Sequence, residues 1–83
     1  MPEYKIVLTK TYLRDSKKLE ANIIRRIIEA IEILKTNPYQ GRKLSSAEIG
    51  KWRLRVGNYR IRYDIEDKDI ILYRVRHRKD IYK

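Results

Sequence analysis

The sequence contains no cysteine, and it has only one histidine, three glycines and two prolines among its 83 residues. Without cysteine the chain has no disulfide framework, no zinc–thiolate site and no thiol nucleophile. The single histidine, His77, excludes a histidine-rich metal site, and the glycines show neither a phosphate-loop nor a dinucleotide-binding spacing. No apolar run approaches the ~20 residues of a membrane-spanning helix, and no signal-peptide apolar region follows Met1. We therefore expect a cytoplasmic protein that uses no cofactor or metal and has no membrane partner.

Positive charge is what the sequence has in excess. Lys and Arg number 21 and Asp and Glu number 11, which gives a net charge of +10. Charged residues make up 39% of the chain, against about 25% in an average domain, while hydrophobic residues still reach 42%. The length fits one small folded domain over residues 1–83. Such a charge attracts a polyanion, either nucleic acid or an acidic protein; a heavily charged surface of the thermophile kind is the alternative.

One strand and two helices are predicted in the first half of the chain. Residues 4–9 are rich in β-formers, and Thr9 or Thr11 can cap a helix after them. The apolar residues of that helix are Tyr12, Leu13 and Leu19. Over residues 21–36 the apolar positions recur at the 3.6-residue period of an amphipathic helix, and we assign this stripe to the core rather than to a partner-binding groove. The stripe consists of Ile23, Ile24, Ile27, Ile28, Ile31 and Leu34. Asn37 and Pro38 end the helix, and residues 39–50 are expected to form a loop.

From Lys51 onward the hydrophobic period changes to two, which is typical of strands. A two-residue turn at Gly57 and Asn58 pairs Trp52 with Tyr63 and puts every apolar residue of the hairpin on one face. The arginines then lie on the other face. Because a slip of one residue would mix the two kinds of side chain, the sequence specifies this register well.

A third strand is expected over residues 70–76, after a turn at residues 67–69. If the turn has three residues, the apolar face gains Ile71, Tyr73 and Val75, and the opposite face gains Arg74 and Arg76. A two-residue turn would reverse this, and we predict the three-residue turn because it keeps charge off the buried face. The expected fold class is α+β: an N-terminal strand, a two-helix hairpin and a three-stranded antiparallel meander (β-α-α-β-β-β), with the helices packed on one sheet face.

The sheet face opposite the core is unusually basic. We define the arginine face by six residues of the predicted strands: Arg53, Arg55, Arg60, Arg62, Arg74 and Arg76, with Arg78 just beyond them. Adjacent strands lie ~4.8 Å apart, so like charges directly opposite each other destabilise a sheet, and Asp64 is the only acid expected among them. Guanidinium groups bind phosphate in a bidentate fashion, which predicts a phosphate-binding surface. A solvated face that serves only solubility is the alternative.

The end of the chain carries groups suited to RNA cleavage. His77, Arg78 and Tyr82 lie within six residues, at the end of the last strand beside the arginine face. Metal-free cleavage needs a group that activates the 2′-hydroxyl, cations that stabilise the extra charge on phosphorus and an acid for the departing 5′-oxygen. Arginine serves only the second role because its pKa is too high for proton transfer. The candidates for proton transfer are Lys51, His77 and Tyr82, with packing roles as the alternatives for His77 and Tyr82.

Two motifs resemble a known family. They are KWRLRVGNYRIRY at residues 51–63 and VRHRKDIY at residues 75–82, and they are similar to the RelE/ParE superfamily of toxins from prokaryotic toxin–antitoxin pairs. The resemblance covers essentially the whole chain, including the opening strand, the helical hairpin and the connection at residues 37–44. It implies a ribosome-dependent endoribonuclease that cuts messenger RNA in the A site, without metal, by attack of the 2′-hydroxyl on the adjacent phosphate.

The resemblance also implies roles for individual residues. Lys51 and Arg53 match the family's basic pair on the first meander strand, and Arg60 matches its phosphate-binding arginine. Arg78 matches the second transition-state arginine, and Tyr82 the C-terminal tyrosine that stacks on or orients the nucleotide. His77 lies where some relatives carry a histidine. Apart from the resemblance, the position of four further residues on the arginine face assigns them to RNA and phosphate binding: Arg55, Arg62, Arg74 and Arg76.

The implied partners are the ribosome, messenger RNA and a RelB-like antitoxin. We expect the antitoxin to wrap the basic domain with an extended or helical segment that carries acidic residues. Two other functions remain open on the sequence. ParE-type members share the fold and poison DNA gyrase, and a non-catalytic basic module would bind RNA or DNA only electrostatically.

Overall fold

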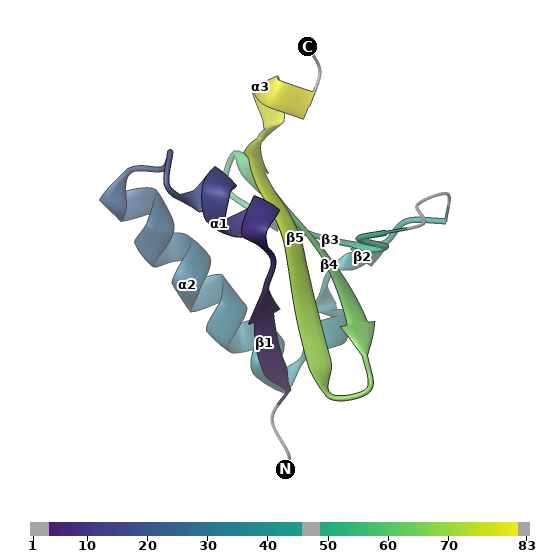
Figure 1. Cartoon of the computed structure of the whole chain (residues 1–83). Coiled ribbons are helices and arrows are strands. Elements are labelled where there is room, and N and C mark those ends of the chain that lie inside the picture. Colours follow the sequence, from purple (N-terminus) through teal and green to yellow (C-terminus); the bar gives the residue numbers. More distant parts are fainter. Residues whose placement is uncertain (1–3, 46–48, 82–83) are drawn as a thin grey trace.

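Five strands form one mixed sheet in the order β1-β5-β4-β3-β2 (Figure 1). The computed structural model describes residues 4–45 and 49–81. The strands are β1 (Lys5–Leu8), β2 (Arg42–Lys43), β3 (Trp52–Val56), β4 (Tyr59–Glu66) and β5 (Asp69–His77). The helices are α1 (Lys10–Ser16), α2 (Ala21–Thr36) and the short α3 (Arg78–Ile81), and a 3-10 turn, η1 (Pro38–Gln40), follows α2. In the described ranges no helix has both the length and the apolar character that crossing a membrane would need.

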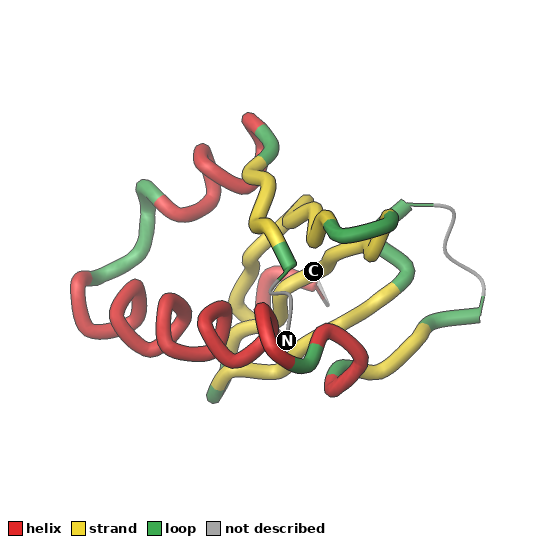
Figure 2. Tube along the Cα trace, turned by 90° about the horizontal axis from the view of Figure 1, so that it is seen from below, coloured by secondary structure: helices red, strands yellow, loops and turns green. Residues whose placement is uncertain are grey.

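The predicted α+β fold is confirmed. The long helix α2 spans the predicted residues and lies across one face of the sheet (Figures 1 and 2). Thr9, not Thr11, caps α1, because its hydroxyl oxygen accepts the backbone N–H of Tyr12 at 3.1 Å. The same hydroxyl donates to the carbonyl of Leu72 at 2.9 Å and so ties the helix start to β5. Leu19 lies beyond the end of α1 rather than on it, although it still packs against the core.

Side chains from both helices and from the inner face of the sheet make the core. It contains Tyr12, Ile27, Leu34, Ile61, Tyr63, Ile70, Leu72 and Val75. The isoleucine stripe of α2 is only partly buried: Ile27 lies in the core, whereas Ile28 is 52% exposed. The assignment of the whole stripe to the core is therefore wrong at Ile28, which faces the groove described below.

The β3–β4 hairpin has the predicted register. Trp52 pairs with Tyr63 and Val56 with Tyr59 across the two-residue turn. Gly57 in this turn has a φ of 60°, a conformation that glycine adopts without steric cost. All apolar side chains of the hairpin therefore share the core face, and its arginines share the other.

The predicted loop over residues 39–50 is wrong at Arg42 and Lys43, which form the edge strand β2. Arg42 pairs with Arg53, and Lys43 pairs with Trp52. Nothing in the local pattern of two charged residues indicates a strand. The pairing is tertiary, because the hydroxyl of Tyr63 donates to the Pro38 carbonyl at 2.8 Å and so holds the end of the helical segment against the sheet.

The predicted three-residue turn between β4 and β5 is also wrong. Glu66 pairs with Asp69, so the turn has two residues, and Ile70 and Leu72 rather than Ile71 and Tyr73 are fully buried. The register then shifts by one residue, since Arg62 pairs with Arg74 while Tyr63 pairs with Leu72. Tyr73 is thus the extra residue of a β-bulge.

The bulge explains why one half of the third-strand prediction is confirmed. Beyond Tyr73 the alternation is restored, so that Val75 lies in the core while Arg74 and Arg76 share a face with the other arginines. Charge is kept out of the core, as expected. The extra residue that achieves this lies inside the ladder instead of in the turn.

The neighbours Leu34 and Ile33 on α2 offer a matched test of this core. Leu34 is 0% exposed and Ile33 is 55% exposed. We expect Leu34→Ala to lower the free energy of unfolding by about 2–5 kcal/mol through lost burial and a cavity. Ile33→Ala should change it by no more than about 0.5 kcal/mol. Urea denaturation followed by circular dichroism measures both, and equal losses would contradict this orientation of α2.

Candidate functional site

The strand pairing arranges seven arginines in two rows across the outer face of the sheet. One row runs through Arg42, Arg53, Arg62 and Arg74, and the second through Arg55, Arg60 and Arg76. Residues directly opposite each other in neighbouring strands point to the same face. The structure therefore brings the six predicted residues of the arginine face together, and it adds Arg42, which sequence reasoning missed because β2 was expected to be loop.

Acidic residue Asp15 of α1 holds Arg74. The Nε and Nη2 atoms of Arg74 donate to the two carboxylate oxygens of Asp15 at 2.8 and 3.1 Å. The backbone N–H of Val75 donates to the same carboxylate at 3.1 Å. The hydrogen bond with Asp15 raises the pKa of Arg74 above its ordinary value. This bidentate pair anchors α1 along the edge of β5, so Arg74 has a structural role whether or not it also contacts phosphate.

A second carboxylate, Asp64 of β4, holds the backbone that leads into β3. It accepts the N–H groups of Gly50 at 3.0 Å and of Lys51 at 2.6 Å. Its neighbour on the same face, Arg62, donates from Nε to the Gly50 carbonyl at 2.7 Å and from Nη2 to the Ile49 carbonyl at 3.3 Å. Arg62 and Asp64 together therefore fix the segment that carries the predicted catalytic residue Lys51.

A hollow of about 170 Å³ lies in the middle of the arginine face. It is lined by Leu44, Arg53, Arg60, Arg62, Arg74 and Arg76. Five guanidinium groups around one small concavity create a strong positive potential and offer forked donors to an anion. Lys51 is exposed just before β3, and the alternation along this strand puts it on the same face as Arg53. The arrangement can bind a phosphodiester, and it has a lysine on the same face of the sheet.

The structure places His77 on the other face of the sheet. His77 pairs with Tyr59, whose ring lies on the core side, and the two ring centroids are 5.0 Å apart in an edge-to-face contact. The Nδ1 atom of His77 accepts the backbone N–H of Lys79 at 3.1 Å. Because Nδ1 accepts, a neutral His77 carries its proton on Nε2. His77 is therefore not brought together with the arginine face.

The tail begins beside the β3–β4 turn. The backbone N–H of Arg78 donates to the Asn58 carbonyl at 2.8 Å, and the exposed Arg78 starts α3 (Figure 1). Tyr82 lies outside the described residues. Within the described part of the chain, no cluster of three or more His, Asp or Glu side chains is arranged to hold a metal ion.

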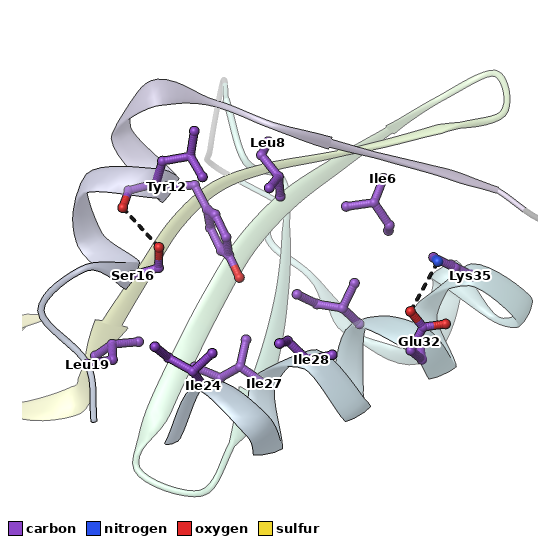
Figure 3. Close-up of a pocket in the computed structure, with 12 residues that line it drawn as sticks. Ile6, Leu8, Tyr12, Ser16, Leu19, Ile24, Ile27, Ile28, Glu32 and Lys35 are labelled. Carbon is purple, nitrogen blue, oxygen red and sulfur yellow. Dashed lines mark hydrogen bonds and ion pairs between the residues drawn. The ribbon is translucent and has the colours of Figure 1, made fainter. Parts of the chain in front are cut away.

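A second surface feature is an apolar groove of about 330 Å³ between α2 on one side and β1 with α1 on the other (Figure 3). Its apolar lining residues are Ile6, Leu8, Tyr12, Leu13, Leu19, Ile24, Ile27, Ile28 and Ile31. Leu8, Leu13 and Ile28 are among the exposed large hydrophobic residues of the molecule. Near one end, Lys35 and Glu32 form an ion pair at 3.1 Å. Contiguous exposed apolar surface with a polar end is typical of a protein interaction site.

The chain matches proteins of one family over nearly its whole length. The ParE toxin family of type II toxin–antitoxin systems (parDE) matches residues 6–82. Toxin RelE3 of Methanocaldococcus jannaschii is 37% identical over an alignment of 83 residues that covers 94% of each chain.

Two solved structures have the same fold. The toxin–antitoxin complex RelBE2 of Mycobacterium tuberculosis contains a chain with a TM-score of 0.82 and 32% identity, over 90% of this chain and 98% of that one. For the RelB–RelE complex of Methanococcus jannaschii the TM-score is 0.76 and the identity 33%, over 92% of this chain and 94% of that one.

The chain therefore belongs to the toxins of type II toxin–antitoxin systems, within the RelE/ParE superfamily. Its named relatives and the solved complexes above place it in the RelE-like branch of that superfamily. The resemblance inferred from residues 51–63 and 75–82 is thereby confirmed.

Removing guanidinium groups from the hollow should weaken RNA binding in a salt-dependent way. Arg60→Ala and Arg76→Ala are each expected to lower the affinity for a single-stranded RNA oligonucleotide. Each should also reduce the slope of log affinity against log salt by about 0.7, the value for one lost phosphate contact. Arg14→Ala, which removes an exposed arginine of α1 outside the hollow, is the control. Fluorescence anisotropy at several salt concentrations measures the slopes, and three equal slopes would contradict phosphate binding in the hollow.

Proposed function

We propose that this toxin is a ribosome-dependent endoribonuclease that cuts messenger RNA and so inhibits translation. The observation that supports this most strongly is the hollow ringed by five arginines, with Lys51 on the same face, in a RelE-like fold. A surface made only for solubility would not concentrate like-charged guanidinium groups around one concavity.

The proposed chemistry is transfer of the phosphoryl group within the message. The 2′-hydroxyl loses its proton and attacks the adjacent phosphorus, the bond to the 5′-oxygen breaks, and that oxygen takes up a proton. The products are a 2′,3′-cyclic phosphate and a 5′-hydroxyl end. No metal is needed if cations already surround the phosphate to stabilise the additional negative charge of the phosphorane.

The residues divide between these tasks according to their chemistry. Arg60 and Arg53 of the hollow, with Arg76 beside them, would stabilise the phosphorane, while Arg55 supports RNA binding nearby. Lys51 is the candidate for proton transfer that lies on this face, whereas His77 lies on the other. Arg78 and Tyr82 keep the roles that the resemblance implies, in charge stabilisation and in stacking on or orienting the nucleotide.

Substitution of the proposed phosphate-binding arginines should abolish toxicity. We expect Arg60→Ala and Arg78→Ala each to reduce message cleavage by 10²-fold or more, roughly the loss seen when one charge-stabilising contact is removed. Arg25→Ala, which removes an exposed arginine of α2, should retain full activity. Reconstituted translation with primer extension on the message measures this, with and without ribosomes and with EDTA in the isolated-RNA arm. Full toxicity of a folded Arg60→Ala, Arg78→Ala double variant would refute these assignments.

The same assay, combined with growth and DNA integrity of cells that express the toxin, separates the alternatives. Cuts at the A-site codon only in the presence of ribosomes support the proposed function. An intact message with arrested growth and broken DNA would favour poisoning of gyrase, which is the activity of ParE-type members. The family that matches this chain carries the ParE name. An intact message without growth arrest would favour a non-catalytic nucleic-acid-binding module.

We also propose that a RelB-like antitoxin occupies the apolar groove. The two solved relatives above are both toxin–antitoxin complexes, and the groove is a largely apolar concavity open at the surface of this chain. An amphipathic segment with acidic residues on its outer side would cover the apolar residues and meet the basic surface around them. Such a segment would also offset part of the net charge of +10.

Two exposed isoleucines of α2 give a matched test of this interface. Ile28 lines the groove and is 52% exposed, while Ile33 is 55% exposed and does not line it. We expect Ile28→Glu to weaken antitoxin binding by at least tenfold, since it buries a charge in an apolar contact, and Ile33→Glu to leave it unchanged. Isothermal titration calorimetry with the antitoxin gives both affinities. Equal affinities of the two variants would mean that the antitoxin binds elsewhere.

A further inference from the structure

Among the residues whose burial the structure describes (4–45 and 49–79), Asp64 is the one buried acidic residue, with 9% of its surface exposed. A buried carboxylate is unfavourable unless hydrogen bonds satisfy it. Asp64 accepts the backbone N–H groups of Gly50 and Lys51, at 3.0 and 2.6 Å. Burial, together with the nearby charge of Asp64, raises the pKa of Tyr73. Two backbone donors thus converge on one charged acceptor, and bonds of this kind are about twice as strong as neutral ones.

The segment that Asp64 holds is fixed from several sides. Arg62, two residues before Asp64 on β4, donates to the carbonyls of Ile49 and Gly50. Gly50 has a φ of 64°, and a Cβ atom there would lie 3.1 Å from the Cβ of Arg62, so another residue would be strained and crowded at this position. The backbone can therefore follow this path only with glycine next to the Asp64–Arg62 pair.

Lys51 is the first residue after this segment, and both of its backbone polar groups are bonded. Asp64 accepts its N–H, and its carbonyl accepts the N–H of Leu44 at 2.6 Å. Leu44 also lines the arginine hollow. An exposed lysine side chain is ordinarily free to move, but here its Cα is held at the edge of the site.

We propose that Asp64 is a positioning residue, which orients Lys51 for proton transfer at the phosphate bound in the hollow. Tyr73 lies beside the same segment, because the β-bulge turns its ring toward the arginine face, where a Cβ atom at Gly50 would lie 3.5 Å from the Tyr73 ring. The inference rests on the proposed function in one respect, namely that Lys51 transfers a proton. The geometric half, that Asp64 determines the position of the Lys51 backbone, is independent of it.

Asp15 provides a matched control within the same chain. Its carboxylate likewise accepts from an arginine, Arg74, and from a backbone N–H, that of Val75. That network anchors α1 rather than Lys51. A variant at Asp15 therefore removes a comparable set of hydrogen bonds to a carboxylate, while the hydrogen bond between Asp64 and the Lys51 backbone stays intact.

The test is a double-mutant cycle measured by single-turnover cleavage on ribosomes. Asp64→Asn keeps the shape of the side chain but replaces one acceptor oxygen with an NH₂ group. One of the two backbone N–H groups therefore loses its acceptor. We expect it to lower the maximal rate about 10- to 100-fold, as for a misplaced catalytic group, while leaving the half-saturating toxin concentration nearly unchanged. In the Lys51→Ala background the same substitution should have no further effect on the rate. Asp15→Asn should change the rate by the same factor in both backgrounds.

A second measurement does not depend on catalysis. Hydrogen exchange of the ¹⁵N-labelled free protein should show slow exchange at the Gly50 and Lys51 amides, and faster exchange there in Asp64→Asn but not in Asp15→Asn. If Asp64→Asn does not fold, Tyr73→Phe, which removes the hydroxyl near Asp64, takes its place in both measurements with smaller effects of the same kind.

The outcomes distinguish the two proposals. Independent, multiplicative effects of Asp64→Asn and Lys51→Ala would overturn the positioning role, and so would unchanged amide exchange at residues 50 and 51. A wild-type protein that cuts no message on ribosomes would instead refute the proposed function. In that case the amide exchange alone decides whether Asp64 holds Lys51.

Discussion

Seven arginines stand opposite one another across four adjacent strands, and the rest of this small structure has to accommodate their repulsion. Neighbouring strands are about 4.8 Å apart, so each arginine has like charges within one strand spacing. The sheet tolerates this because the opposite face buries a continuous apolar core. Specific partners also help: Asp15 holds Arg74, and the carbonyls of the 49–50 segment hold Arg62.

These partners also connect the charge pattern to the architecture. The hydrogen bonds of Asp15 with Arg74 and Val75 hold α1 along the edge of β5. This part of β5 lies beyond residues 69–72, which pair with β1. Arg62 uses its contacts to hold the segment that leads into β3. The same side chains that create the positive surface therefore position parts of the fold, and the hollow between them is kept at a defined width by the ladder of the sheet.

In the proposed function, the two sides of the domain bind different partners: RNA on one side and the antitoxin on the other. The arginine face offers forked, charged donors that suit phosphate, while the groove between α2 and the N-terminal strand and helix offers apolar surface. Because the two surfaces lie on different sides of the sheet, a partner with an apolar segment and acidic flanks can engage the groove and still extend toward the basic face. His77, on the core side at the strand end, belongs to neither the hollow nor the groove.

The local pattern of the sequence by itself determined α2, the β3–β4 register and the separation of arginines from apolar residues. In each case a period of 3.6 or 2 leaves one arrangement that keeps charge out of the core. The local pattern did not determine the β4–β5 turn. A three-residue turn, and a two-residue turn followed by a bulge at Tyr73, both put Val75 in the core and keep Arg74 and Arg76 on the opposite face.

Strand β2, the partners of Arg62 and Arg74 and the face on which His77 lies were decided only by the tertiary structure. They depend on contacts between residues far apart in the chain, such as Asp15 with Arg74 and Asp64 with Gly50, and no periodicity within one segment encodes such a contact.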